Sequence, residues 1–187
     1  MLIAIGIFLL IIFIIVIALA GFVIMTYNRF ISLAERVKNA KGQIAAQIES
    51  RWDAVSNLIS ATKQYASYES ETLEKIVEKR VNINENSSIE DLEENDAQLN
   101  NVVGRLIAIS EAYPDLKASE VYIQTMESVN KFEDNVRHSR MIYNDVVTNY
   151  NRQLKQFPTN IIAKFFKFSE EKYFERSEEK AAMPSWG

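Results

Sequence analysis

The chain opens with an unbroken apolar stretch, and polar side chains appear in number only after it. Residues 2–25 contain no charged side chain. As an α-helix rising about 1.5 Å per residue, this stretch would span roughly 36 Å, slightly more than the hydrocarbon core of a bilayer, which is about 30 Å thick. The pattern therefore predicts a membrane-spanning helix, and we expect residues 1–26 to form a transmembrane anchor.

A cleaved signal peptide is the alternative interpretation of the same stretch. Ala18 and Ala20, just before Gly21, fit the small-x-small pattern of a cleavage site. A secretory leader begins with basic residues, whereas here no basic side chain precedes the apolar run, and the run continues past the would-be site to Met25. These features favour an uncleaved anchor.

The remainder of the chain predicts long helices, because residues that break helices are rare. Apolar residues recur at spacings of three and four, the period of an amphipathic helix, and no strand-like alternation appears. Pro114 and Pro158 each mark the end of a helix. The expected helices span residues 27–81, 89–113 and 119–157, with a further helical turn or two in residues 159–166.

The segment 82–88, "NINENSS", predicts a turn between the first two of these helices. Its side chains compete with the helical backbone for hydrogen bonds. Ser88 and Asp91, three residues apart, resemble a capping box at the start of the next helix. Because short loops make neighbouring helices antiparallel, we expect the third helix to run parallel to the first.

The fold class predicted is all-α: an N-terminal transmembrane helix continuing into an elongated antiparallel three-helix bundle, with a short additional C-terminal helix. The domains expected are the anchor, a helical bundle over residues 27–168, and a charged, loosely ordered tail over residues 169–187. In this arrangement residues 165–174, "FFKFSEEKYF", emerge at the end of the bundle far from the membrane. We expect them to fold back onto the bundle rather than touch a bilayer.

Charged residues interrupt the apolar stripes, and an unpaired buried charge would cost several kcal/mol. We therefore predict a buried ionic network that fixes the register of the helices. The expected pairs are Glu69 with Arg140 and Arg51 with Glu111, with Arg80 near Arg140. The full set is Arg51, Glu69, Arg80, Glu111, Glu133 and Arg140.

The same set permits a catalytic or metal-binding interpretation, in which Glu69 and Glu133 converge. Carboxylate-bridged metal sites in bundles use Glu-x-x-His pairs on two helices, and the chain's single histidine, His138, lies off the apolar stripe. The chain also has no cysteine, which removes disulfides and thiolate ligands. We expect no catalytic residue, no metal site and no cofactor.

A repeated Tyr-Asn pair raises the question of a binding site. Tyr143-Asn144 and Tyr150-Asn151 stand seven residues apart in "YNDVVTNYN", and Tyr27-Asn28 follows the apolar segment. A spacing of seven places the two later tyrosines on one helical face, with the asparagines on its flank. We predict two packing rungs whose amides bond across to a neighbouring helix. Tyr27 is expected to be an interfacial anchor, where tyrosine suits the headgroup boundary.

The charge distribution bears on topology and partners. Within about 20 residues of the apolar segment, the basic side chains are all on its C-terminal side. The positive-inside rule therefore predicts a short outside N-terminus and a cytoplasmic body in a bacterial cell membrane. The net charge of −4 is small and of mixed sign, which argues against nucleic acid as a partner.

The motifs along the chain resemble those of the LemA family of bacterial membrane proteins. They are, in order, "YNRF", "RWDAVSNL", "YASYE", "EAYPDLKAS", "YNDVVTNYN" and "FPTNIIAKFF". The resemblance implies an N-terminal transmembrane helix, a short outside N-terminus and a helical-bundle body. It supplies no catalytic residues.

Together these features favour a membrane-anchored, non-enzymatic protein that acts by protein interaction or self-assembly, as a scaffold or adaptor of the envelope. Its expected partners are the lipid bilayer, unidentified membrane or envelope proteins, and other copies of itself. The alternative is a ligand-responsive module coupled to the membrane. An enzyme that uses Glu69 and Glu133 is a more distant third.

Overall fold

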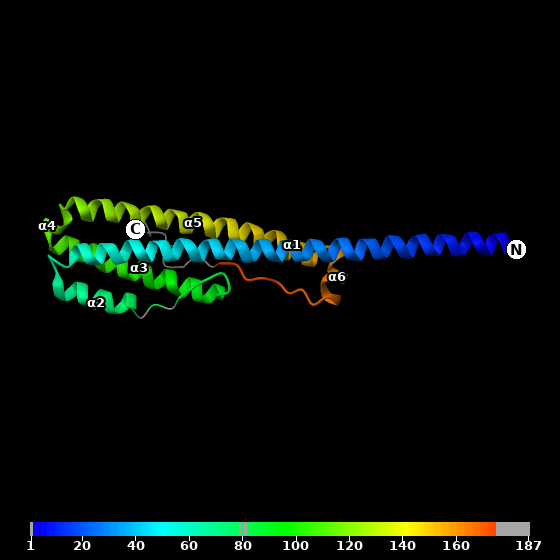
Figure 1. Ribbon diagram of the computed structural model, residues 1–187, viewed down its shortest axis with the longest axis horizontal. Helices are drawn as coiled ribbons and strands as arrows, with labels where there is room; N and C mark the ends of the chain where they lie inside the picture. Colours follow the sequence, from blue (N-terminus) through cyan, green and yellow to red (C-terminus); the bar gives the residue numbers. More distant parts are fainter. Residues whose placement is uncertain (1, 79, 81, 175–187) are drawn as a thin grey trace, which may run out of the picture. The chain divides into compact units, whose positions relative to one another are not determined.

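The computed structural model describes residues 2–78, 80 and 82–174, which contain helices and no strand (Figure 1). The helices are α1 (Leu2–Thr62), α2 (Ser67–Glu78), α3 (Ile89–Ala112), α4 (Pro114–Lys117), α5 (Glu120–Lys155) and α6 (Thr159–Phe165). The predicted all-α fold, in which a long apolar N-terminal helix precedes the others, is confirmed.

The chain forms two compact units. The first, here the anchor unit, comprises Met1–Val37 and Val146–Glu171, and the second, the bundle unit, comprises Lys38–Asp145 and Lys172–Gly187. Helices α1 and α5 each contribute residues to both.

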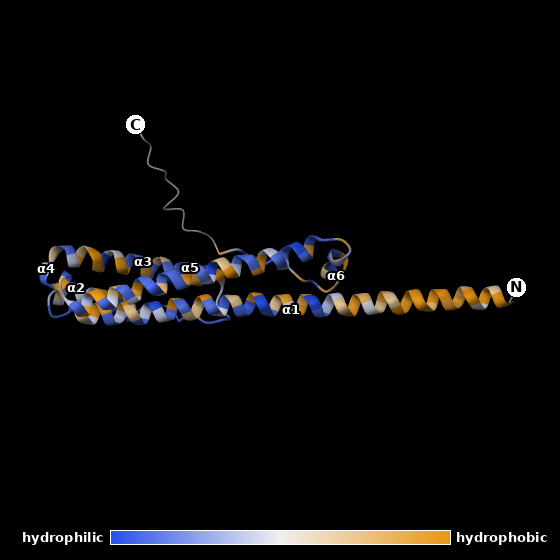
Figure 2. Cartoon of the chain, turned by 90° about the horizontal axis from the view of Figure 1, so that it is seen from above, coloured by the Kyte–Doolittle hydropathy of each residue, from blue (hydrophilic) through white to orange (hydrophobic). Residues whose placement is uncertain are grey.

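The anchor unit contains the apolar part of α1. It is long and apolar enough to cross a membrane (Figure 2), and its large apolar side chains are exposed. From Thr26 onward, α1 packs against the end of α5 and against α6. The buried apolar residues of this unit are Phe30, Leu33, Val37, Val147, Tyr150, Leu154, Ile162 and Ala163.

In the bundle unit, residues 38–62 of α1 pack with α2, α3 and the first part of α5. Helix α5 runs antiparallel to α1 (Figures 1 and 2), so the predicted parallel arrangement of the first and last long helices is wrong. The core of this unit includes Ile44, Ile48, Trp52, Val55, Leu58, Leu73, Leu92, Leu99, Leu106, Val129, Val136 and Tyr143.

The parallel arrangement was wrong because the first soluble helix does not reach residue 81. Helix α1 ends at Thr62, residues 63–66 form a turn, and α2 leads the chain back before α3 begins; Val81 itself lies outside the described residues. The hydroxyls of Ser56, Ser60 and Thr62 each donate to the carbonyl oxygen four residues earlier. Such side-chain bonds compete with the helical backbone and bend helices. The extra reversal changes the direction of every later helix.

Other boundaries follow the sequence closely. Ser88 caps α3, its hydroxyl accepting from the backbone N–H of Asp91 at 3.1 Å while the Asp91 carboxylate accepts from the N–H of Ser88 at 3.0 Å. This capping box and the turn before it confirm the prediction. Helix α3 ends at Ala112, before Pro114, and α5 ends at Lys155, shortly before Pro158.

Gly42 of α1 lies under the turn that precedes α3. A Cβ added at this position would stand 3.3 Å from the Cβ of Glu85. The absence of a side chain on Gly42 therefore allows residues 82–88 to pack closely against α1.

Candidate functional site

The bundle unit holds a cluster of charged side chains between three helices, here the ionic cluster: Arg51 of α1, Asp96 of α3, and Glu133 and Arg140 of α5. A guanidinium nitrogen of Arg51 lies 2.8 Å from a carboxylate oxygen of Glu133, and another lies 3.6 Å from Asp96. Arg140 pairs with the second oxygen of Asp96. Two positive and two negative charges therefore face each other, and one carboxylate is shared by both arginines.

Burial makes this pairing necessary. The exposed fraction is 1% for Arg51 and 4% for Asp96. Desolvation lowers the pKa of Arg51, and the negative charges of Glu133 and Asp96 oppose that shift. Arg51 also donates to the side-chain oxygen of Asn100 at 2.9 Å, and Asn100 in turn donates to Asp96 at 3.2 Å. The buried charges are thus stabilised mainly by one another.

The C-terminal segment contributes to the environment of Arg140. The guanidinium of Arg140 lies 4.5 Å from the centre of the Phe174 ring, in a cation–π arrangement. Phe174 is 6% exposed. The Phe174 ring therefore shields one side of the Arg140 guanidinium from water.

The structure brings together part of the predicted network and separates the rest. Arg51, Glu133 and Arg140 meet in the ionic cluster. The predicted pairs Glu69 with Arg140 and Arg51 with Glu111 are wrong, because they required the third long helix to run parallel to the first. Glu111 is exposed.

Glu69 and Arg80 have other partners in the bundle unit. The hydroxyl of Tyr113 donates to Glu69 at 3.2 Å, and the negative charge of Glu69 raises the pKa of Tyr113. Arg80 donates to Glu49 at 3.1 Å and lies 5.7 Å from the centre of the Trp52 ring. Glu69 thus links α2 to the residue that follows α3, and Arg80 links the segment after α2 to α1.

Asp96, at the centre of the ionic cluster, was missed by the sequence reasoning. The signal was present, because Asp96 stands four residues after Leu92 and three before Leu99, on the apolar stripe of α3. A lone carboxylate within an apolar stripe indicates a buried partner on another helix.

The Tyr-Asn repeat binds the C-terminal segment rather than a helix. In the bundle unit, the Asn144 amide accepts from the backbone N–H of Phe174 at 2.9 Å and donates to its carbonyl at 3.1 Å. Tyr143 donates its hydroxyl to the carbonyl of Lys172 at 2.8 Å. The predicted bonds to a neighbouring helix are therefore wrong for Asn144.

In the anchor unit, Asn151 makes the same two bonds to Glu171, donating at 2.8 Å and accepting at 2.9 Å. Each asparagine thus reproduces the paired donor and acceptor of a β-ladder. Burial and then the charge of Glu171 raise the pKa of neighbouring Tyr150. Residues 171–174 are accordingly held by specific hydrogen bonds, unlike the loosely ordered tail that was expected; residues 175–187 lie outside the described part of the chain.

Tyr27 differs from the other two tyrosines of the repeat. Its ring centre lies 4.7 Å from that of Phe166 and 5.8 Å from that of Phe168, all within the anchor unit. Asn28 is exposed. Tyr27 therefore belongs to an aromatic cluster with Phe30, Phe166 and Phe168, whereas Asn144 and Asn151 form what is here called the asparagine clamp. The Tyr27-Asn28 pair has a role separate from that of the other two pairs, as predicted.

The chemistry available to these groups is limited. Among the described residues, no group of three His, Asp or Glu side chains could hold a metal ion. Glu69 and Glu133 have separate partners, and His138 is exposed. A shallow polar hollow of the bundle unit lies between α1 and α5, lined by Ser50, Asp53, Ala54, Asn57, Gln124, Thr125, Ser128 and Phe132.

Comparison with known proteins places the chain in a family. The LemA family profile matches residues 40–185. Protein LemA of Metamycoplasma hominis is 28% identical over 141 residues, which cover 73% of this chain and 63% of that protein. Magnetosome protein MamQ 2 of Paramagnetospirillum magneticum is 24% identical over 186 residues, covering 86% of this chain and 68% of the relative. Magnetosome protein MamQ of Magnetospirillum gryphiswaldense is similar at 24% identity, covering 85% and 69%.

The family match spans most of the chain and agrees with the motifs noted in the sequence. The apolar N-terminal helix is consistent with a single-pass membrane anchor, and the relatives indicate a membrane-associated protein. The chain belongs to the LemA family.

Proposed function

We propose that this protein is a membrane-anchored, non-enzymatic scaffold or adaptor that acts by protein interaction or self-assembly. The observation that carries the proposal is the composition of the ionic cluster. Its two arginines and two carboxylates are paired with one another across three helices. Charges arranged in this way position helices, and none is left aimed at a substrate.

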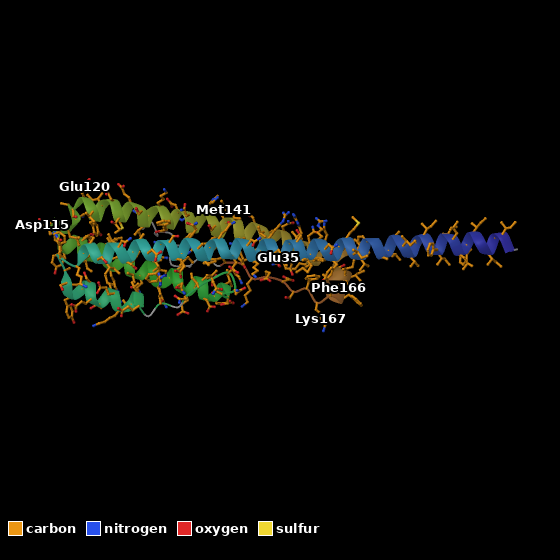
Figure 3. All side chains as sticks on the ribbon, viewed as in Figure 1. Glu35, Asp115, Glu120, Met141, Phe166 and Lys167 are labelled. Carbon is orange, nitrogen blue, oxygen red and sulfur yellow. The ribbon has the colours of Figure 1, made fainter. Side chains whose placement is uncertain are left out.

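The outer faces of the bundle unit offer apolar side chains for such interactions. Val121, Ile123 and Met141 of α5 are between 46% and 60% exposed, and Ile107 of α3 is 45% exposed. Met141 lies on the outer side of α5 (Figure 3). Aromatic residues and methionine are enriched at protein interfaces, although scattered exposed apolar residues are also common on monomers.

Cysteine crosslinking in intact membranes tests this proposal, because the natural chain has no cysteine. Single variants Ile123→Cys and Met141→Cys would be treated with a bismaleimide, with Lys131→Cys, at another exposed position of α5, as the matched control. The proposal expects discrete higher-mass bands from the first two variants and weaker ones from the control. If all three variants gave only the monomer band when expressed at the natural level, the proposal would be contradicted.

A ligand-responsive module is the second candidate, and the polar hollow between α1 and α5 favours it. A small polar molecule bound there would contact both helices and change their packing. A thermal-shift screen of the detergent-solubilised protein tests this candidate. A hit that Asn57→Ala abolishes would support it, and a blank screen would count against it.

We also propose that the bundle unit faces the cytoplasm, as the basic residues after the apolar segment predict. An exposed cysteine introduced by Asn130→Cys should stay unlabelled by an impermeant maleimide in intact cells and react after lysis. Labelling in intact cells would reverse the orientation.

A further inference from the structure

The part of the anchor unit around α6 exposes large apolar side chains that the fold does not use. Ile161 and Phe165, one turn apart on α6, are 60% and 79% exposed, and Phe157, just before the helix, is 77% exposed. The opposite side of α6 is the one that packs, since Ile162 and Ala163 are 6% and 2% exposed. Helix α6 is therefore apolar on two sides, and only one of them is covered.

The covered side of α6 fixes its place within the anchor unit. Phe166 and Phe168 lie against Tyr27, and the ring of Phe168 is also 5.0 Å from that of Phe30. Tyr27 comes two residues after Met25, the last residue of the uncharged apolar segment. Tyrosine at such a position lies at the boundary between hydrocarbon and headgroups. Helix α6 thus packs against α1 just after the apolar segment ends.

The end of α6 is built to hold this contact. Phe168 N–H donates to the carbonyl of Ala163 at 3.0 Å, and Lys167 N–H donates to that of Lys164 at 3.2 Å. Lys167 has φ of 59°, so these bonds form a Schellman motif with Lys167 in the left-handed region. The motif turns the chain sharply and directs Phe168 back toward α1.

The charged side chains of α6 and of the residues that immediately flank it are lysines. Residues 156–168 contain Lys164 and Lys167 and no acidic residue. Both lysines are exposed, and Lys167 points away from α1 (Figure 3). Exposed aromatic residues beside lysines are typical of segments that lie in the interface of an anionic bilayer.

We propose that the α6 region, residues 157–167, is a second membrane contact. The exposed apolar side of α6, which carries Ile161 and Phe165, inserts shallowly into the headgroup region of the bilayer that α1 spans. Lys164 and Lys167 bind anionic lipid headgroups. The contact is continuous with the membrane anchor, which distinguishes the bilayer from a protein partner as the occupant. It orients the anchor unit relative to the membrane surface, since two separate attachments restrict rotation about α1.

Depth measurements on the full chain in vesicles test the proposal. Phe165→Cys, labelled with an environment-sensitive fluorophore, would be compared with the equally labelled control Lys131→Cys. Vesicles of phosphatidylcholine alone and with phosphatidylglycerol would each contain a brominated lipid as quencher. We expect the brominated lipid to quench the label at position 165 and not at 131, with stronger quenching in the anionic vesicles.

Substitution of the two lysines provides an independent test of the proposal. Lys164→Gln and Lys167→Gln should each lower the ratio of docked to undocked α6 by about fivefold in anionic vesicles, with little change in neutral ones. Helical content measured by circular dichroism should be unchanged, because both side chains are exposed.

Two results would overturn the proposal. One is a label at position 165 that a water-soluble quencher reaches as readily as the control in both kinds of vesicle. The other is a label shielded from both quenchers that crosslinks to a second copy of the chain, which would identify a protein as the occupant. Alkaline extraction separates this test from membrane anchoring: an anchored chain stays with the vesicles whether or not α6 docks.

Discussion

The ionic cluster of the bundle unit and the aromatic cluster of the anchor unit hold their helices by different means. Arg51 and Asp96 are buried charges that must meet partners of opposite sign in defined positions. Phe30, Tyr27 and Phe168 need only shape and apolar surroundings. The charges of the ionic cluster are therefore paired with one another in one register, whereas the aromatic cluster tolerates repacking and leaves apolar surface on α6 for a further contact.

The largest effect should come from removing one member of the ionic cluster. Arg51→Ala removes the buried cation that links Glu133 to Asp96, leaving Glu133 with Arg137 and Asp96 with Arg140, and breaking a buried pair costs about 3–5 kcal/mol. Thermal or urea unfolding of the protein in detergent, followed by circular dichroism, measures the loss. The exposed control Arg105→Ala should change stability by less than about 0.5 kcal/mol. If Arg51→Ala were as stable as the unsubstituted protein, the ionic cluster would not hold the helices together.

The asparagine clamp should give the next largest effect. Asn144→Ala leaves a backbone N–H and a carbonyl of Phe174 without their partner, at a cost of about 1–3 kcal/mol. Hydrogen exchange should show faster exchange at the amide of Phe174 and little change in the helices. Asn130→Ala, at an exposed position of the same helix, is the control. Unchanged protection at Phe174 would mean that the clamp does not hold the segment.

A milder change tests how well the aromatic cluster tolerates repacking. Phe30→Leu keeps an apolar side chain of similar size but loses ring contacts with Tyr150 and Phe168, and should cost about 1–1.5 kcal/mol. The same substitution at exposed Phe165 should be neutral for folding. A loss at Phe30 as large as that of Arg51→Ala would remove the contrast between the two clusters.

A stabilising change of about 1 kcal/mol is expected at the end of α6. Lys167 occupies a left-handed backbone conformation that glycine adopts without steric cost, so Lys167→Gly should raise the unfolding free energy. Chemical denaturation of the full chain measures the change. Lys164→Gly, inside α6, should destabilise instead. A destabilised Lys167→Gly variant would argue against the Schellman motif.

The smallest effect concerns pH. Hydrogen bonds from the Ser88 side chain and backbone lower the pKa of Asp91 below its ordinary value of 3.8. Because the folded-state pKa is lowered, the capping box contributes stability above the unfolded pKa and loses it as pH falls through the folded one. Stability should thus decline below about pH 4 with a contribution that Asp91→Asn removes. A titration of Asp91 by NMR that shows a raised pKa would contradict the assignment.

Local features of the fold were predictable from the sequence, and long-range ones were not. Pro114, the turn at residues 82–88 and the Ser88 cap act through their immediate neighbours, so their outcomes follow from local chemistry. The end of α1 at Thr62 depends on three hydroxyl groups and on where α2 can pack, which a periodic apolar pattern does not reveal. That one missed break reversed α5.

The same distinction applies to the candidate site. Charges on an apolar stripe indicated a buried network, and the structure does bring Arg51, Glu133 and Arg140 together. Which charges pair depends on helix direction, so Asp96 was missed and Glu69 and Glu111 were paired wrongly. The clamp at Asn144 and Asn151 was beyond sequence reasoning, because its partner is the backbone of residues 171–174, which carries no signature of its own.

We propose that the ionic cluster positions helices and performs no chemistry, and the conservative variant Glu133→Gln tests this proposal. The amide keeps the shape of Glu133 and can still accept from Arg51, but it removes the negative charge. Unfolding stability and the crosslinked assembly of the Ile123→Cys protein would be measured together in the same membranes. We predict a stability loss of about 1–3 kcal/mol with assembly preserved below the unfolding temperature. Unchanged stability with assembly abolished would contradict this proposal and assign Glu133 a direct functional role.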